Sequence, residues 1–164
     1  MSVLALEVAK FRQWAAFRLG PDHISDASTH GDGEWGCDYP DWQALYSAIE
    51  ACLLSKTGGT NLVTADEREL LLYALARDNE DEVTLELFEQ FPDASIQLAR
   101  AGIDYPDIDA RWQVAVLLGR IKRADAVSLL QRFLEDDSEY VRRRAGTALQ
   151  EIQSRDLPSP VRKV

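Results

Sequence analysis

The sequence predicts an all-α protein, a short α-solenoid of about eight helices. The main observation is a helical pattern that occurs twice within residues 107–152, where Arg111 aligns with Arg142 and Leu118 with Leu149, each pair 31 residues apart. A second amphipathic segment lies between the two copies. Two helices per unit at this period are typical of α-solenoids, whose units cannot bury their apolar faces alone. The other observation is that no stretch alternates between apolar and polar residues over a length that predicts a strand.

The first 60 residues hold two predicted helices and a long acidic loop. The helix over 3–18 has apolar residues at helical spacing and stops at Gly20-Pro21. The loop over 19–40 is longer than most connections in a compact domain, and such loops tend to be functional or disordered. From residue 21 to 41 there are six acidic residues and no Lys or Arg. The second helix is expected over 41–54.

Three further helices are predicted between residues 64 and 101. Thr64 and Glu67 have the spacing of a capping box, which predicts the start of a helix that continues to residue 77. The next helix is expected over 80–91. Proline at the start of 92–101 favours a third short helix.

The last three helices are expected over 107–121, 124–135 and 138–152. Beyond residue 152 the chain is predicted to leave the helix, and residues 156–164 form a short tail. The whole chain, 1–164, is therefore interpreted as a single domain. Its first third is divergent, and 64–155 forms the helix pairs.

A four-residue motif marks two of the predicted helix starts. Asp38-Tyr-Pro-Asp41 recurs as Asp104-Tyr-Pro-Asp107, each time directly before a helix. Proline keeps the preceding residue out of helical geometry, and the Asp that follows can cap free backbone N–H groups. The recurrence indicates that both motifs are entries to a repeat.

The two copies within 107–152 share an Asp near the helix start, an Arg one turn further on, small residues in the helix and a Leu-x-x-Ile ending. In the first copy this ending is Leu118-Gly-Arg-Ile121, and the second copy contains the pair Val141-Arg142. With these features the segment resembles the HEAT-like repeats first described in phycobilisome lyases. The resemblance covers about the last third of the chain. It implies a right-handed stack of helix pairs with a concave inner face, and binding as the main role.

The resemblance also implies a ladder of polar contacts. Arg111 and Arg142 are expected to bond acidic or backbone groups of a neighbouring repeat, with Asp107 and Asp137 as their acidic counterparts. Gln150 stands where the family usually has Gly, and Ala110 where Val is usual. The Gln implies that the last helix continues or ends differently, as a capping helix would.

Composition limits the classes of partner. The net charge is −10 and the pI is near 4.6, which argues against non-specific binding of nucleic acid and leaves room for a basic protein. No apolar run is long enough to span a bilayer, and the N-terminus does not have the pattern of a signal peptide. We therefore expect a cytoplasmic protein that does not bind membranes. Cys37 and Cys52 lack the spacing of a metal or redox site.

The sequence does not predict a catalytic site, a metal or a cofactor. The only histidines, His23 and His30, both lie in the loop over 19–40 and match no metal motif. An enzyme of the lyase or glycosylase class is the alternative, and it would need a concave pocket such as one lined by Trp112 and Asp109. A third alternative is a scaffold that self-associates through the last helix, although the apolar face of this helix is expected to pack onto 124–135.

We predict a non-catalytic protein-binding module that is a monomer on its own and binds a basic protein. Its most concrete form is a bacterial immunity protein that neutralises a basic, nuclease-type toxin. Exposed aromatics would supply contact area and carboxylates would pair with Lys or Arg of the partner; the alternative is that Trp35 and Trp42 cap the N-terminal core. The candidate partner-binding residues are these acids and aromatics: Asp32, Glu34, Trp35, Asp38, Tyr39, Trp42, Glu80, Asp81 and Glu82.

Overall fold

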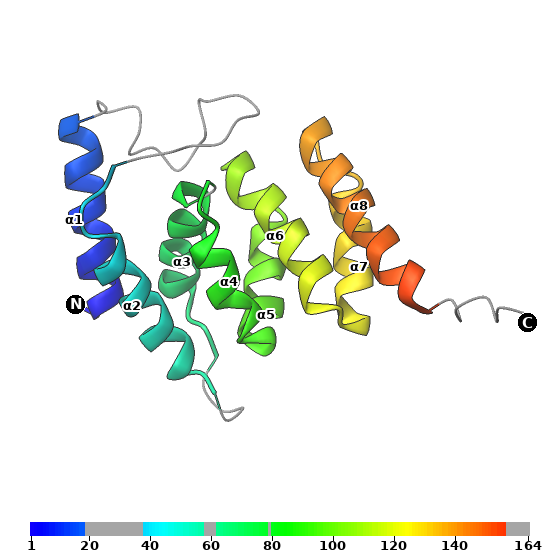
Figure 1. Ribbon diagram of the computed structural model, residues 1–164, viewed down its shortest axis with the longest axis horizontal. Coiled ribbons are helices and arrows are strands. Elements are labelled where there is room, and N and C mark those ends of the chain that lie inside the picture. Colours follow the sequence, from blue (N-terminus) through cyan, green and yellow to red (C-terminus); the bar gives the residue numbers. More distant parts are fainter. Residues whose placement is uncertain (19–37, 58–61, 79, 157–164) are drawn as a thin grey trace, which may run out of the picture.

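The computed structural model describes residues 1–18, 38–57, 62–78 and 80–156, without the side chains of the last two. These residues form eight α-helices and no strand, which confirms the predicted all-α solenoid (Figure 1). The helices are α1 (Val3–Arg18), α2 (Trp42–Leu54), α3 (Ala65–Arg77), α4 (Val83–Glu89), α5 (Pro92–Gly102), α6 (Ile108–Ile121), α7 (Ala124–Phe133) and α8 (Glu139–Asp156). None of them is long and apolar enough to cross a membrane.

The helices form four antiparallel hairpins that stack side by side in two layers. One layer holds α1, α3, α5 and α7, and the nearer layer in Figure 1 holds α2, α4, α6 and α8. Helices of the nearer layer all begin at the upper end of the stack, where the two helices of each hairpin are joined. We call this end the turn edge. Because α4 is short, α6 also packs against α3.

The core lies between the layers and is densest around α6. Val114, Leu117 and Leu118 of this helix have no measurable exposure. The apolar face of α8 packs against α7, as predicted, and also against α6. Helices α6 and α8 lie very close together at Gly119 of α6. A Cβ added at this glycine would lie 2.8 Å from the Cβ of Ala148 in α8.

Two helices differ from the sequence prediction by three or more residues at one end, and the others agree to within two residues. Helix α4 spans Val83–Glu89 instead of 80–91, because Glu82 has left-handed backbone geometry (φ 56°) that cannot continue a helix. Helix α8 continues to Asp156, so the prediction that the chain leaves the helix after residue 152 is wrong. No Gly or Pro lies between Ile152 and Asp156 to break the helix.

Candidate functional site at the turn edge

Three hairpin turns each contain a buried Asp that joins two hairpins. These residues are Asp78 before α4, Asp107 before α6 and Asp136 before α8. Each carboxylate accepts a backbone N–H at or directly before the start of the following helix. Each also contacts a side chain of the preceding hairpin, through hydrogen bonds at Asp78 and Asp136 and through an ion pair at Asp107. The turn edge is therefore held together by one repeated type of contact.

Asp78 joins the first hairpin to the second with neutral partners. The hydroxyl of Tyr46 in α2 donates to its Oδ1 at 3.1 Å, and the backbone N–H of Thr84 donates to its Oδ2 at 2.6 Å. Asp78 is 3% exposed. Burial raises the pKa of this carboxyl, although the two hydrogen bonds oppose the shift.

Asp107 joins the second hairpin to the third through an ion pair. Its carboxylate lies 2.8 Å from Nη1 of Arg77, the last residue of α3, and accepts the backbone N–H of Asp109 at 2.9 Å. Neither side chain of the pair is more than 6% exposed. Burial raises the pKa of Asp107, with the Arg77 charge acting against it. The guanidinium also lies over the Tyr73 ring, 5.0 Å from its centre.

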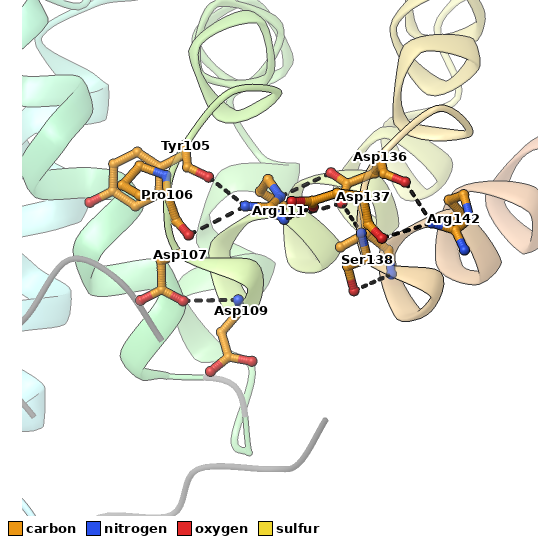
Figure 2. A network of polar contacts seen from close by, with 10 residues as sticks. Tyr105, Pro106, Asp107, Asp109, Arg111, Asp136, Asp137, Ser138 and Arg142 are labelled. Carbon is orange, nitrogen blue, oxygen red and sulfur yellow. Dashed lines mark hydrogen bonds and ion pairs between the residues drawn. The ribbon is translucent and has the colours of Figure 1, made fainter. Parts of the chain in front are cut away.

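Asp136 joins the third hairpin to the fourth (Figure 2). Arg111 of α6 donates from Nε to Oδ2 at 2.9 Å and from Nη2 to Oδ1 at 3.1 Å, a bidentate pair. The same guanidinium donates to Asp137 and to the backbone oxygens of Tyr105 and Pro106. Asp136 in turn accepts the N–H of Ser138 at 2.8 Å.

These contacts confirm the expectation that Arg111 bonds acidic groups of a neighbouring repeat. The contacts of Asp107 and Arg142 differ from those expected. Arg111 bonds Asp137 as predicted, whereas Asp107 pairs with Arg77 of the preceding hairpin. Arg142 belongs to the last hairpin of the described residues, and it donates to the backbone oxygens of Asp136 (2.6 Å) and Asp137 (2.9 Å) within its own turn.

Sequence reasoning missed Asp136 as the main partner of Arg111. The sequence does contain a signal for Asp136, which is its position just before a helix. The carboxylate of Asp136 accepts the backbone N–H of Ser138, two residues further on, and Asp107 accepts the N–H of Asp109 with the same spacing.

Exposed carboxylates surround these buried links. We call them the acidic edge: Asp38, Asp41, Glu80, Asp81, Asp104, Glu135, Asp137 and Glu139, all exposed and all in the turns or at the first residue of α8. Acids at helix N-termini stabilise the helix dipole, which explains part of this distribution. The two arginines beneath them, Arg77 and Arg111, are buried and paired. Carboxylates therefore outnumber cations on the surface of this edge, where Arg132 is exposed and lies 3.8 Å from Asp104.

Of the predicted binding residues, three lie on the acidic edge. These are Asp38, Glu80 and Asp81. Glu82 is half-buried and pairs with Arg120 of α6, which also bonds Glu89 at 2.9 Å. It therefore contributes to packing between α4 and α6. Three more, Asp32, Glu34 and Trp35, lie outside the described residues, as do Cys37 and both histidines.

The two described aromatics of that set lie in the N-terminal core. Tyr39 is 5% exposed, and its ring contacts Phe11, Trp14 and Trp42 at centre distances of 4.9, 5.3 and 5.7 Å. Burial raises the pKa of its hydroxyl to about 12. Trp42 is half-buried and stacks on Tyr46 at 5.4 Å. Tyr39 therefore has no exposed ring to offer a partner, and the condition of exposure on which its predicted binding role depends is not met.

Trp112 and Asp109 pack between α6 and α8. The indole N–H of Trp112 donates to Asp109 at 3.1 Å, and its ring meets Tyr140 edge-on at 5.6 Å. Arg144 lies over the same indole, 5.1 Å from its centre. Two cavities formed by the described residues have no lining contribution from Trp112 or Asp109. Within the described ranges, no three acidic, His or Cys side chains form a cluster that could hold a metal.

Comparison with known proteins identifies the repeats. A family model of HEAT repeats matches residues 96–163, which include α6, α7 and α8. No curated protein and no solved structure matches the chain. HEAT repeats generally mediate protein–protein interaction. The more specific resemblance to the repeats of phycobilisome lyases remains a prediction from the sequence. The family model identifies residues 96–163 as HEAT repeats, and the stacked helix hairpins of the described residues are consistent with a short solenoid of such repeats.

Proposed function

We propose that this chain is a non-catalytic binding protein whose acidic edge binds a basic protein. The observation that carries the proposal is the separation of charge at the turn edge. Eight carboxylates are exposed there, of which Asp137 pairs with Arg111 and Asp104 lies 3.8 Å from the exposed Arg132. Arg77 and Arg111 are buried and paired within the fold. A surface of one sign attracts a partner of the other and accelerates their encounter.

The specific form of this proposal is an immunity protein that neutralises a nuclease-type toxin. The active sites of nucleases carry cations that hold phosphate, so an array of carboxylates could cover them in place of the substrate. A net charge of −10 also suits a partner of opposite charge. Self-repulsion at this charge supports a monomer before binding.

The test compares two variants with equal charge. The edge variant carries Glu80→Gln, Asp81→Asn, Glu135→Gln and Glu139→Gln. The control variant carries Glu50→Gln, Glu69→Gln, Glu86→Gln and Glu151→Gln, which are exposed acids outside the acidic edge. Each variant changes the net charge from −10 to −6, since four charges are removed.

The binding experiment is affinity capture of proteins from native cell extract at low and at high salt. We expect a basic protein to be retained at low salt and weakened at high salt. The edge variant should bind this protein about tenfold or more weakly, because four contacts of a few tenths of a kcal/mol to 1 kcal/mol each are lost. The control variant should keep most of the affinity. If neither salt condition yields a basic partner, the proposal is wrong.

The toxin form has its own readout. The captured protein is expressed alone and together with this chain, and growth of the cells is measured. We expect the captured protein to arrest growth, the wild-type chain to restore it, and the edge variant to fail. A captured protein without toxicity would leave the acidic edge as a binding surface and rule out the immunity role.

A further inference from the structure

Two arginines of α8 follow the acidic edge and form no ion pair within the described part of the chain. Arg143 and Arg144 are exposed and lie in the second turn of the helix. Glu139, the last carboxylate of the acidic edge, stands four residues before Arg143, a rise of about 6 Å. The sign of the exposed charge therefore changes within about one turn of α8.

One tyrosine holds both guanidinium groups. The central carbons of Arg143 and Arg144 each lie 5.0 Å from the centre of the Tyr140 ring, so they are at most twice that distance apart. Arg144 also donates from Nε and Nη2 to the Tyr140 hydroxyl at 3.1 and 2.6 Å. Its guanidinium lies over Trp112 of α6 as well. These contacts limit the motion of both side chains, so the pair is arranged before an anion arrives.

The acids of this neighbourhood do not compensate the pair. Glu139 is exposed and forms no ion pair with either arginine. Asp137 is paired with Arg111. Asp109 is 4% exposed and accepts an indole N–H. Arg142, which precedes the pair, donates to backbone oxygens and bonds no carboxylate in the described structure. The first two turns of α8 therefore carry three arginines and one acid.

The two guanidinium groups keep free donors. A guanidinium has five N–H donors, of which Arg144 uses one at Nε and one at Nη2 on Tyr140. Among the described residues, Nη1 of Arg144 has no acceptor and the Arg143 side chain donates no hydrogen bond. Planar guanidinium groups bond two oxygens of a carboxylate or phosphate at once. The ligand that fits the pair is therefore an anionic group with more than one oxygen.

We propose that Arg143 and Arg144 bind a carboxylate-bearing segment of the same basic partner that the acidic edge attracts, an inference that rests on the proposed function. A nucleic acid or an acidic protein carries many negative charges and is repelled by a chain with a net charge of −10. A protein that is basic overall is attracted, and acids beside its basic residues can meet the arginines. The surface of the partner would then repeat the charge pattern of this chain with the signs reversed.

The arginine pair gives the complex a direction. The acidic edge follows the hairpin turns, and Arg143 and Arg144 lie at its α8 end. A partner that docks the other way round would place its carboxylates against those of the edge and lose the contact with the arginines. Like charges that meet in this way oppose the wrong orientation, so the pair contributes to specificity more than to attraction.

Two peptides that differ only at their acids test the inference by NMR titration of the full chain. The probe is acetyl-Lys-Ala-Lys-Ala-Lys-Ala-Glu-Ala-Glu-amide, in which an extended chain presents lysines and acids on the same side. The comparison peptide has Gln in place of both Glu, and charge attraction alone favours it because it is more positive. We nevertheless expect the Glu peptide to bind at least as tightly. It should also shift the signals of the Arg144 Nε–H and the Trp112 indole N–H.

Two double variants of equal charge separate the pair from the overall field. Arg143→Gln with Arg144→Gln removes the pair. Arg18→Gln with Arg100→Gln removes two exposed arginines of α1 and α5, and each double variant changes the net charge from −10 to −12, since two positive charges are lost. We expect the ratio of Glu-peptide to Gln-peptide affinity to fall about threefold or more in the first variant and to stay near the wild-type value in the second. Arg143→Gln alone, which keeps the hydrogen bonds of Arg144 to Tyr140, should lose part of the preference.

Three outcomes would overturn the inference. These are equal affinity ratios in the two double variants, Arg144 and Trp112 signals that do not move with the Glu peptide, and no binding of either peptide at millimolar concentration. An oligothymidylate that moves these signals more than the Glu peptide does would also overturn it, because the pair would then bind phosphate. A failure of the proposed function looks different, since the Gln peptide would then bind the edge variant as tightly as it binds the wild type.

Discussion

Replacing Gly119 with alanine tests how closely α6 and α8 pack. The added Cβ would lie 2.8 Å from the Cβ of Ala148 and 3.1 Å from its Cα, so a backbone has to move. Overpacking of this kind costs about 1–3 kcal/mol. Alanine also gains about 1 kcal/mol of helix propensity over glycine. The expected net effect on the free energy of unfolding is a loss of up to about 2 kcal/mol.

Gly146 of α8 is the matched control. A Cβ added there meets nothing closer than Leu134 Cδ2 at 3.8 Å, an ordinary contact. Gly146→Ala should therefore keep the propensity gain and raise the free energy of unfolding by about 0.5–1 kcal/mol. The two substitutions are chemically identical, yet we expect them to differ by about 1–3 kcal/mol.

Urea unfolding followed by circular dichroism measures this difference as a shift of the midpoint. With a slope of about 2 kcal/mol/M, the two midpoints should lie about 1 M apart. Ala148→Gly in the Gly119→Ala background should relieve the overlap, with a coupling energy of about 0.5–3 kcal/mol. If Gly119→Ala stabilises the protein as much as Gly146→Ala does, the result contradicts the tight packing of α6 against α8 at Gly119.

Three further predictions concern the links and caps. Arg77→Met should lower the free energy of unfolding by about 3–5 kcal/mol in urea titrations, because Asp107 would be left charged and buried. The control is Arg123→Met, which removes a solvent-exposed ion pair and should have little effect. Burial raises the folded-state pKa of Asp78, so its stabilisation is fully present below the unfolded pKa of about 4 and is lost as pH rises through the folded pKa. The stability of the wild type relative to Asp78→Asn should therefore increase as the pH falls from 7 towards about 4. Thr64→Ala removes the N-cap hydroxyl of α3 and should cost about 1 kcal/mol by thermal unfolding.

Each of these has an outcome that contradicts it. Equal losses for Arg77→Met and Arg123→Met would mean that burial does not decide the strength of the pairs. A difference between wild type and Asp78→Asn that is constant with pH would mean that Asp78 has the same pKa in both states. An unchanged midpoint for Thr64→Ala would mean that α3 does not depend on its cap.

The helices were predictable because their starts and stops are local. Thr64 accepts the N–H of Glu67 at 3.3 Å and Glu67 accepts the N–H of Thr64 at 2.8 Å, the capping box that the sequence indicates. The repeated pattern likewise placed α6 and α8. The error at α4 has a local cause that the sequence does not reveal, since Glu82 is a non-glycine residue with positive φ.

The links between hairpins were predictable only in part. That Arg111 bonds an acidic group of the neighbouring repeat follows from the repeat, although its main partner, Asp136, was not predicted. The pair of Arg77 with Asp107 depends on how α3 lies against α6, and α4 and α5 intervene in the sequence. Asp78 and Tyr46 are likewise 32 residues apart and carry no motif. Contacts of this kind arise from packing, so composition and periodicity do not predict them.

Part of the acidic edge could also be predicted from the sequence. Charge counting pointed to the acids between the first helix and α5, and it placed Asp38, Glu80 and Asp81 among the candidates. It did not show that Asp104 and Glu135, far along the chain, lie near each other at one end of the stack, where they line the same cavity. Periodicity also could not show that Tyr39 turns inward, because it lies outside a helix.

The two ends of the stack are fastened by different kinds of contact, and this has a mechanical consequence. At the turn edge, Arg77–Asp107 and Arg111–Asp136 are buried, where salt screens them weakly. At the opposite end, Arg123 ties α7 to Asp93 of α5 through an ion pair open to solvent. Added salt should therefore weaken the contact of Arg123 with Asp93 more than the two buried links of the turn edge. The order in which neighbouring hairpins separate would then depend on ionic strength, with the buried links of the turn edge parting last.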